Sequence, residues 1–215
     1  MLLLIWQAQF ALSYAAIGIL RALYTGVMAC FQVPVASAAR RFGGARILAA
    51  GTAVAAVAYL FFGTSHSVAA LAMALVLGGI GSSSQHPIAS SLVAAAYAGP
   101  RSRGALGTYN FAGDLGKMTL PSITAGLAAV TSWRSAVLAI GVIGMLGAGI
   151  ILLLLRSGPM GAARVQSRPQ ADKVRDRSSL LHSGFFLLLA IGVIDSATRM
   201  GFLTFLPFLL RGKRG

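Results

Sequence analysis

The chain has 215 residues, of which 57% are hydrophobic and 10% are charged; its formal net charge is +14 and its mean hydropathy is +0.80. Soluble domains average about 45–50% apolar and about 25% charged residues, so this composition excludes an ordinary water-soluble domain. It predicts an all-α, polytopic membrane protein.

The first apolar segment, residues 1–10, is too short to cross a bilayer and has neither the basic region nor the cleavage site of a signal peptide. We expect it to be the end of an earlier helix. The next segments each hold about 20 residues or more, enough to cross a hydrocarbon core about 30 Å thick at about 1.5 Å per residue. The predicted spans are residues 12–39, 47–63, 68–98, 104–130, 134–155 and 181–210.

Residues 156–180 are rich in Arg, Ser, Gly, Pro and Gln, a composition typical of a flexible linker. The predicted organisation is therefore an N-terminal transmembrane bundle over residues 1–155, a basic linker over 156–180, and the first helix of a second bundle over 181–215. The one cysteine, Cys30, lies inside a span, and we expect it to be a small packing residue.

Basic residues are concentrated in alternate connections between the spans. The first, third and fifth connections contain Arg40, Arg41, Arg46, Arg101, Arg103, Arg156, Arg164, Arg168, Lys173, Arg175 and Arg177. The second connection has no basic residue and the fourth has only Arg134. Cytoplasmic loops are enriched in Lys and Arg, so we predict that the basic loops face the cytoplasm from the inner (plasma) membrane. Anionic headgroups account for this charge without nucleic acid.

The segment 211–215 carries three positive charges and would lie outside after six crossings. Together with the short first segment, this favours an incomplete chain. Within the spans, prolines and glycines are frequent. We expect kinks at Pro34, Pro87, Pro121 and Pro207, and close helix approach at Gly78, Gly79, Gly81, Gly104, Gly107, Gly113 and Gly116.

Polar residues recur at helical spacing on four of the predicted spans. The stripes are Arg21, Thr25, Met28 and Gln32; Ser82, His86 and Ser90 with Gln85 beside them; Asn110, Asp114, Lys117 and Pro121; and Asp195 with Arg199. Because lipid cannot satisfy these groups, we predict that they face a partly wet cavity inside the bundle. The substrate-cavity candidates are Arg21, Thr25, Gln32, Gln85, His86 and Asn110, and the proton-coupling candidates are Asp114, Lys117, Asp195 and Arg199.

Each candidate also has a structural interpretation. The two acid–base pairs are either static ion pairs that hold helices in register or carboxylates that exchange a proton when the pair separates. His86 is either a proton relay or a packing residue beside a proline kink. Gln32 and Asn110 either contact substrate or bond across helices.

The first connection reads Ala36-Ser37-Ala38-Ala39-Arg40-Arg41-Phe42-Gly43-Gly44. It resembles the Gly-x-x-x-Asp-Arg-x-Gly loop between helices 2 and 3 of the major facilitator superfamily. Arg41 and Gly43 match this gating loop, whereas Ala36 and Arg40 replace the Gly and the Asp. The resemblance implies that the spans are helices 2 to 7 of twelve, a partial major-facilitator fold, and that the linker connects the two halves.

The stretches from Gly78 to Pro87 and from Arg101 to Gly116 resemble the fosmidomycin-resistance-type exporters of that superfamily. This resemblance implies drug resistance by efflux of a small molecule through a proton antiporter. The cationic stripe residues favour an anionic substrate. The arginine that many drug exporters carry in helix 4 is absent here.

Two other interpretations stay open. A membrane-embedded hydrolase would need a nucleophile, but the chain has neither a Gly-x-Ser-x-Gly elbow nor a His-Glu-x-x-His motif, and it contains no glutamate. We therefore expect that the protein is not an enzyme and has no cofactor or metal site. The second interpretation is an inactive remnant, because alternating access needs two bundles that move around a shared site.

Overall fold

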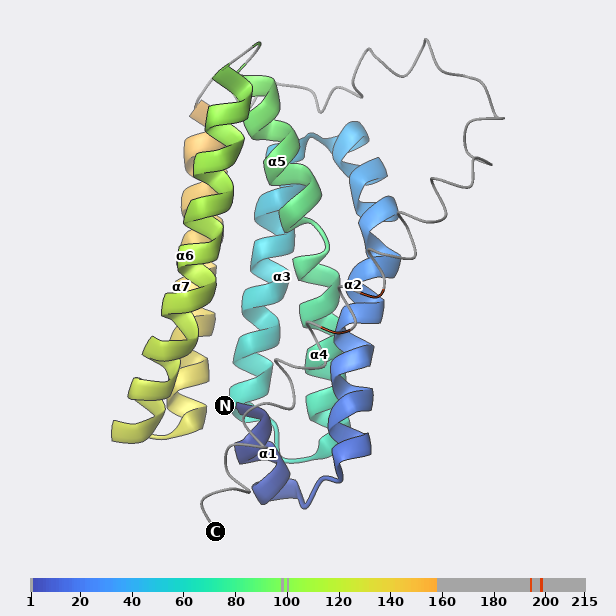
Figure 1. Cartoon of the computed structure of the whole chain (residues 1–215), viewed down its shortest axis with the longest axis vertical. Coiled ribbons are helices and arrows are strands. Elements are labelled where there is room, and N and C mark those ends of the chain that lie inside the picture. Colours follow the sequence, from blue (N-terminus) through green and yellow to red (C-terminus); the bar gives the residue numbers. More distant parts are fainter. Residues whose placement is uncertain (1, 98, 100, 158–193, 195–197, 199–215) are drawn as a thin grey trace. The chain divides into compact units, whose positions relative to one another are not determined.

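The computed structural model describes residues 2–97, 99, 101–157, 194 and 198. The described part is helical and contains no strand, which confirms the all-α prediction. Its helices are α1 (Leu2–Phe10), α2 (Tyr14–Phe42), α3 (Gly44–Thr64), α4 (Val68–Ser82), α5 (Gln85–Ala96), α6 (Arg101–Val130) and α7 (Trp133–Ser157). In Figure 1 the colours follow the chain, from α1 in blue to α7 in yellow and orange. Apart from residues 194 and 198, the predicted span over 181–210, with Pro207, lies outside the described residues.

The chain divides into two compact units. One comprises residues 1, 3–5 and 167–215, and the other comprises residues 2 and 6–166. The second unit holds nearly all of the described helices. Within it, α3 packs against α7, α4 and α2, while α6 packs against α7 and α5.

The turns between helices have specific caps. The Ser13 hydroxyl accepts a hydrogen bond from the Ala16 amide at 3.1 Å, and the Ser67 hydroxyl accepts one from the Ala70 amide at 3.2 Å. Both serines therefore satisfy an amide that the first turn of a helix leaves without a backbone partner. Gly43 ends α2 with its amide donating to the Ala39 carbonyl at 2.9 Å. Its φ of +95° favours glycine, which explains the match to the glycine of the gating loop.

The predicted span over residues 68–98 is broken into α4 and α5. Pro87 has no amide hydrogen, so the Ser83 carbonyl loses its normal helical donor and the turn is released. At the break, the Ser83 and Ser84 hydroxyls donate to the Ile80 and Gly81 carbonyls of the preceding turn, at 2.6 and 2.9 Å. Both serines are 1% exposed. The prediction of a kink at Pro87 is thus confirmed, whereas Pro34 and Pro121 lie inside continuous helices.

Glycines allow close packing where α4 crosses its neighbours. A Cβ atom on Gly79 would lie 2.8 Å from the Tyr24 carbonyl of α2, and one on Gly81 would lie 2.6 Å from the Gly51 carbonyl of α3. The expected close approach at these glycines is confirmed. A second crossing joins α3 to α7, where a Cβ atom on Gly141 would lie 2.7 Å from Leu60.

The glycines of α6 behave differently. A Cβ atom on Gly104, Gly107, Gly113 or Gly116 would have no atom within 4 Å apart from its own helix. The expectation that these four bring helices together is therefore wrong for the described residues. The physical reason is that none of the α6 residues is buried, so its glycines have no described neighbour to approach.

Four helical segments in the described part are long and apolar enough to cross a membrane: Tyr14–Phe42, Gly44–Thr64, Val68–Ala96 and Trp133–Leu154. They match the predicted spans over 12–39, 47–63, 68–98 and 134–155. The helix predicted over 104–130 is present as α6 but is not one of these four segments. Its polar and charged residues, Asp114 and Lys117 among them, lower its hydropathy.

Candidate functional site

A polar cluster lies where α2, α3 and α4 meet. The Tyr24 hydroxyl of α2 donates to the Ser82 hydroxyl of α4 across 2.9 Å. Arg21 lies one turn before Tyr24 on the same helix and is half-buried. The structure thus joins the stripe residue Ser82 to Tyr24, which is a helical neighbour of Arg21. The sequence analysis missed Tyr24; the available signal was a phenol within one turn of a stripe residue.

Farther along α2, the remaining stripe residues Thr25, Met28 and Gln32 differ in their exposure and hydrogen bonding. The Thr25 hydroxyl contacts the Arg21 and Ala22 carbonyls of its own helix, at 3.1 and 3.2 Å. This leaves its oxygen lone pairs, but not its proton, for a ligand. Met28 is half-buried and Gln32 is exposed.

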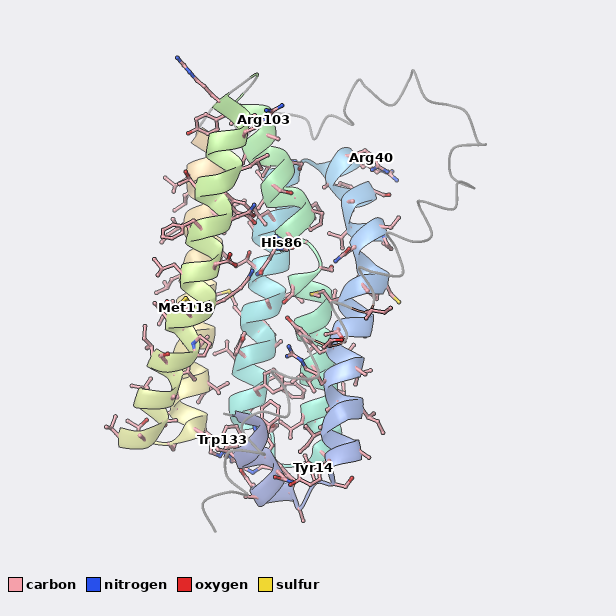
Figure 2. The ribbon with its side chains drawn as sticks, in the orientation of Figure 1. Tyr14, Arg40, His86, Arg103, Met118 and Trp133 are labelled. Carbon is pink, nitrogen blue, oxygen red and sulfur yellow. The ribbon has the colours of Figure 1, made fainter. Side chains whose placement is uncertain are left out.

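The start of α5 presents the next group of candidates. Gln85 and His86 are both exposed. The His86 ring makes an edge contact with Tyr109 of α6, with 6.5 Å between ring centroids. Ser90 donates its hydroxyl to the His86 carbonyl at 2.7 Å, so the side chain of this stripe residue is bonded locally. His86 therefore stands at the contact between α5 and α6, at mid-height in Figure 2.

Asp114 and Lys117 form an ion pair on α6. The Lys117 Nζ lies 2.9 Å from the Asp114 Oδ1, one helical turn away. Their side chains are 69% and 68% exposed, and Asn110, one turn earlier, is exposed too. The sequence predicted the pair from its spacing, and the structure brings the two charges into contact. The second predicted pair, Asp195 with Arg199, lies outside the described residues.

The candidate gating loop connects α2 to α3. Arg41 is exposed, and its guanidinium carbon lies 5.4 Å from the centre of the Phe42 ring. Arg40 donates to the Ser37 hydroxyl at 2.9 Å. Figure 2 shows Arg40 and Arg103 at one end of the helices and Trp133 at the other. The first and third connections, which carry these two arginines, thus lie at the same end of the described helices, whereas the fifth connection lies outside the described residues beyond residue 157.

At the opposite end of the helices, Arg134 connects two turns. The sequence analysis assigned no role to this residue. Its guanidinium donates to the Ser65 carbonyl at 3.0 Å and lies 3.2 Å from the His66 Nδ1. These contacts connect the α3–α4 turn to the start of α7. Beside them, the Trp6 ring of α1 stacks on Phe62 at 5.3 Å. The sequence offered one signal for this role, because Arg134 is the only basic residue in the second and fourth predicted connections.

In the described residues, no group of three or more His, Cys, Asp or Glu side chains could hold a metal ion. The helices instead carry separate polar groups on α2, α5 and α6, an arrangement suited to binding a small molecule or moving a proton.

The family model of the Major Facilitator Superfamily matches residues 1–215. The chain belongs to this superfamily. Comparison with curated proteins and with solved structures gave no match. Membership makes the protein a multi-pass membrane transporter, with the bilayer as its surroundings and a small molecule as its substrate.

Proposed function

We propose that this major facilitator protein exports a small anionic molecule in exchange for protons. The observation that carries the proposal is the Asp114–Lys117 ion pair on α6. The proposal takes α6 to cross the bilayer in addition to the four apolar segments, and charged side chains within such a helix are costly and mark pathways for substrates or ions. The pair lies on a helix with no buried residue, so both charges are accessible from the face that α6 presents.

In the proposed cycle, Asp114 is the residue that carries the proton, and Lys117, 2.9 Å away, is its ion-pair partner. The proton binds Asp114 from one side of the membrane and leaves it to the other side. Each cycle therefore moves one proton from one side to the other, provided that access changes between the two steps.

The proposed substrate is an anion because the charged candidates comprise three cations, Arg21, Lys117 and Arg199, and two carboxylates, Asp114 and Asp195. Arg21 lies on α2, one turn before Tyr24 of the polar cluster, and Lys117 lies on α6. His86, beside Tyr109, offers a ring nitrogen to a proton or to a substrate oxygen. Gln32, Gln85 and Asn110 are exposed amides that can fix orientation by hydrogen bonds.

The direction of transport and the orientation follow from different features. The proposed direction, export, rests on the resemblance to the fosmidomycin-resistance-type exporters carried by the segments Gly78 to Pro87 and Arg101 to Gly116. The proposed orientation in the inner membrane places the end with Arg40 and Arg103 in the cytoplasm.

The test is transport in sealed vesicles that contain the purified protein and a pH-sensitive dye. A panel of small organic anions and matched cations is added under an imposed pH gradient. We expect anion movement accompanied by proton movement for the wild type and Asp114→Glu, and loss of proton movement in Asp114→Asn. Unchanged proton-driven transport in Asp114→Asn would remove the coupling role.

A companion variant tests the substrate side. Arg21→Ala is expected to weaken the apparent affinity for the transported anion, and an unchanged affinity would make Arg21 a packing residue. The competing interpretation, an inactive remnant, predicts no transport of any panel compound by the folded wild-type protein.

A further inference from the structure

The ring of His66 lies against a permanent positive charge. His66 is in the turn between α3 and α4, and the Nη1 atom of Arg134, in the first turn of α7, lies 3.2 Å from its Nδ1 and 3.4 Å from its Nε2. The same guanidinium donates to the Ser65 carbonyl through Nη2 at 3.0 Å. Because a guanidinium stays protonated in a protein, it can only donate to the imidazole. The contact therefore requires a ring nitrogen that accepts a hydrogen bond.

The protonation state of His66 decides whether this contact is attractive. A neutral imidazole has one nitrogen with a free lone pair, and both nitrogens are within reach of the Arg134 Nη1, so either tautomer supplies an acceptor. A protonated imidazole carries a hydrogen on both nitrogens and has no acceptor. It also places a second positive charge 3.2 Å from the first. Protonation of His66 thus replaces an attraction with a repulsion.

No carboxylate in the described residues compensates for that repulsion. Asp114, the one acidic residue among them, is paired with Lys117 on α6. Helix α1, the end of α6 and the first turn of α4 contain no ionisable side chain. Helices α2 and α3 contribute the phenols of Tyr14 and Tyr59, which stay neutral where histidine titrates. The guanidinium is therefore the charged group that governs how His66 responds to pH.

The contact holds the α3–α4 turn on α7. The end of α3 has a second attachment to α7, because a Cβ atom on Gly63 would lie 3.2 Å from the Arg134 carbonyl oxygen. The turn itself is bonded locally: the Ser65 hydroxyl donates to the Phe62 carbonyl at 2.7 Å, and the Ser67 hydroxyl caps α4. Loss of the guanidinium contact would thus free the turn from α7 while α3 and α7 stay packed.

We propose that His66 is a pH sensor that releases the α3–α4 turn from α7 when its imidazole is protonated. Histidine changes charge between about pH 5 and about pH 8, so the contact is present at the upper end of this range and is lost as the pH falls through it. Figure 2 shows Trp133, the neighbour of Arg134, at the end opposite Arg40. In the proposed orientation the sensor responds to the pH outside the cell. The pH response itself does not depend on Asp114 or on export.

The first test is intrinsic fluorescence of the purified full chain in detergent, titrated from about pH 8 to about pH 5. The chain has two tryptophans, and both report on this end. The Arg134 guanidinium carbon lies 5.1 Å from the centre of the Trp133 ring, and Trp6 meets that ring edge-on at 6.5 Å. Wild-type emission is expected to change in one transition. His66→Gln, neutral throughout, should keep the high-pH emission, and His66→Lys, charged throughout, should show the low-pH emission.

Amide hydrogen exchange separates release of the turn from direct quenching of the tryptophans by the imidazolium. Two charges about 4 Å apart in water shift an equilibrium roughly fivefold by their repulsion. After correction for the intrinsic rate, the amides of the α3–α4 turn should therefore exchange roughly fivefold faster at the low-pH end. Arg134→Gln should abolish this dependence on pH, because it removes the second charge.

The matched control is His86→Gln/His182→Gln, which leaves His66 as the only histidine in the chain. It is expected to keep both the fluorescence transition and the difference in exchange. A transition that persists in His66→Gln, or that disappears in the control, would overturn the proposal. A fluorescence transition with unchanged exchange would overturn it too, because the turn would then remain attached to α7.

Discussion

Replacement of Gly81 by Ala tests whether backbone contact between α3 and α4 sets the packing of the bundle. The added methyl group would meet the Gly51 carbonyl oxygen at 2.6 Å, the Ala55 Cα at 2.9 Å and the Ala55 amide nitrogen. All three atoms belong to the α3 backbone, so no side chain can rotate away. The two helices would have to separate.

The expected size of the effect combines two opposing contributions. Overpacking costs about 3 kcal/mol at the upper end of its usual range, appropriate where only backbone can yield. Alanine recovers about 1 kcal/mol of helix propensity over glycine. The net loss is about 2 kcal/mol, or about 4–8 °C in midpoint temperature for a chain of this size.

The assay is thermal unfolding in detergent followed by circular dichroism. The control is Gly107→Ala on α6, where the added methyl group meets nothing within 4 Å beyond its own helix. That variant is expected to unfold at the wild-type temperature or slightly above. A midpoint for Gly81→Ala at or above that of Gly107→Ala would refute the assigned crossing.

Three further predictions concern the turns and the polar cluster. Gly43→Ala should lower stability by about 1 kcal/mol or more, because its φ of +95° disfavours a side chain; thermal unfolding measures this, and an unchanged midpoint would contradict that conformation. Tyr24→Phe and Ser82→Ala should each lower the free energy of unfolding by about 1 kcal/mol, because each removes the 2.9 Å hydrogen bond. In a double-mutant cycle, the loss in the double variant should be smaller than the sum of the two single losses. Additive losses would mean that this hydrogen bond contributes nothing. Arg134→Gln should speed amide hydrogen exchange around Ser65, since the 3.0 Å bond from the guanidinium is lost; unchanged exchange would show that the turn does not need it.

Local sequence patterns predicted much of this fold. The lengths of the apolar segments predicted four of the membrane spans correctly, because hydropathy directly reflects how well a segment suits the lipid. Pro87 gave the position of the break between α4 and α5, since a missing amide has its effect within one turn. The contact between Asp114 and Lys117 was also local, one turn along α6.

Contacts between distant residues were harder to predict. Tyr24 and Ser82 are 58 residues apart, and no periodicity on either helix indicates which face meets the other. The packing of the glycines was equally hard to predict, because Gly81 packs against α3 whereas Gly107 has open space beside it. A single sequence shows that a residue is small but not what lies opposite it.

The central claim is that Asp114 exchanges a proton during transport and is not simply half of a structural ion pair. The decisive variant exchanges the two charges, Asp114→Lys with Lys117→Asp. Because the residues are one turn apart on an exposed face, the exchanged pair can form with the same spacing. Thermal unfolding checks that it folds as the wild type does.

The measurement is proton movement per transported anion in vesicles for this exchanged variant, beside the wild type and Asp114→Asn. The account predicts a stable protein without proton-linked transport, because the carboxylate has left the position from which it meets the proton pathway. Restoration of wild-type proton movement by the exchange would contradict the account and leave the pair a structural role.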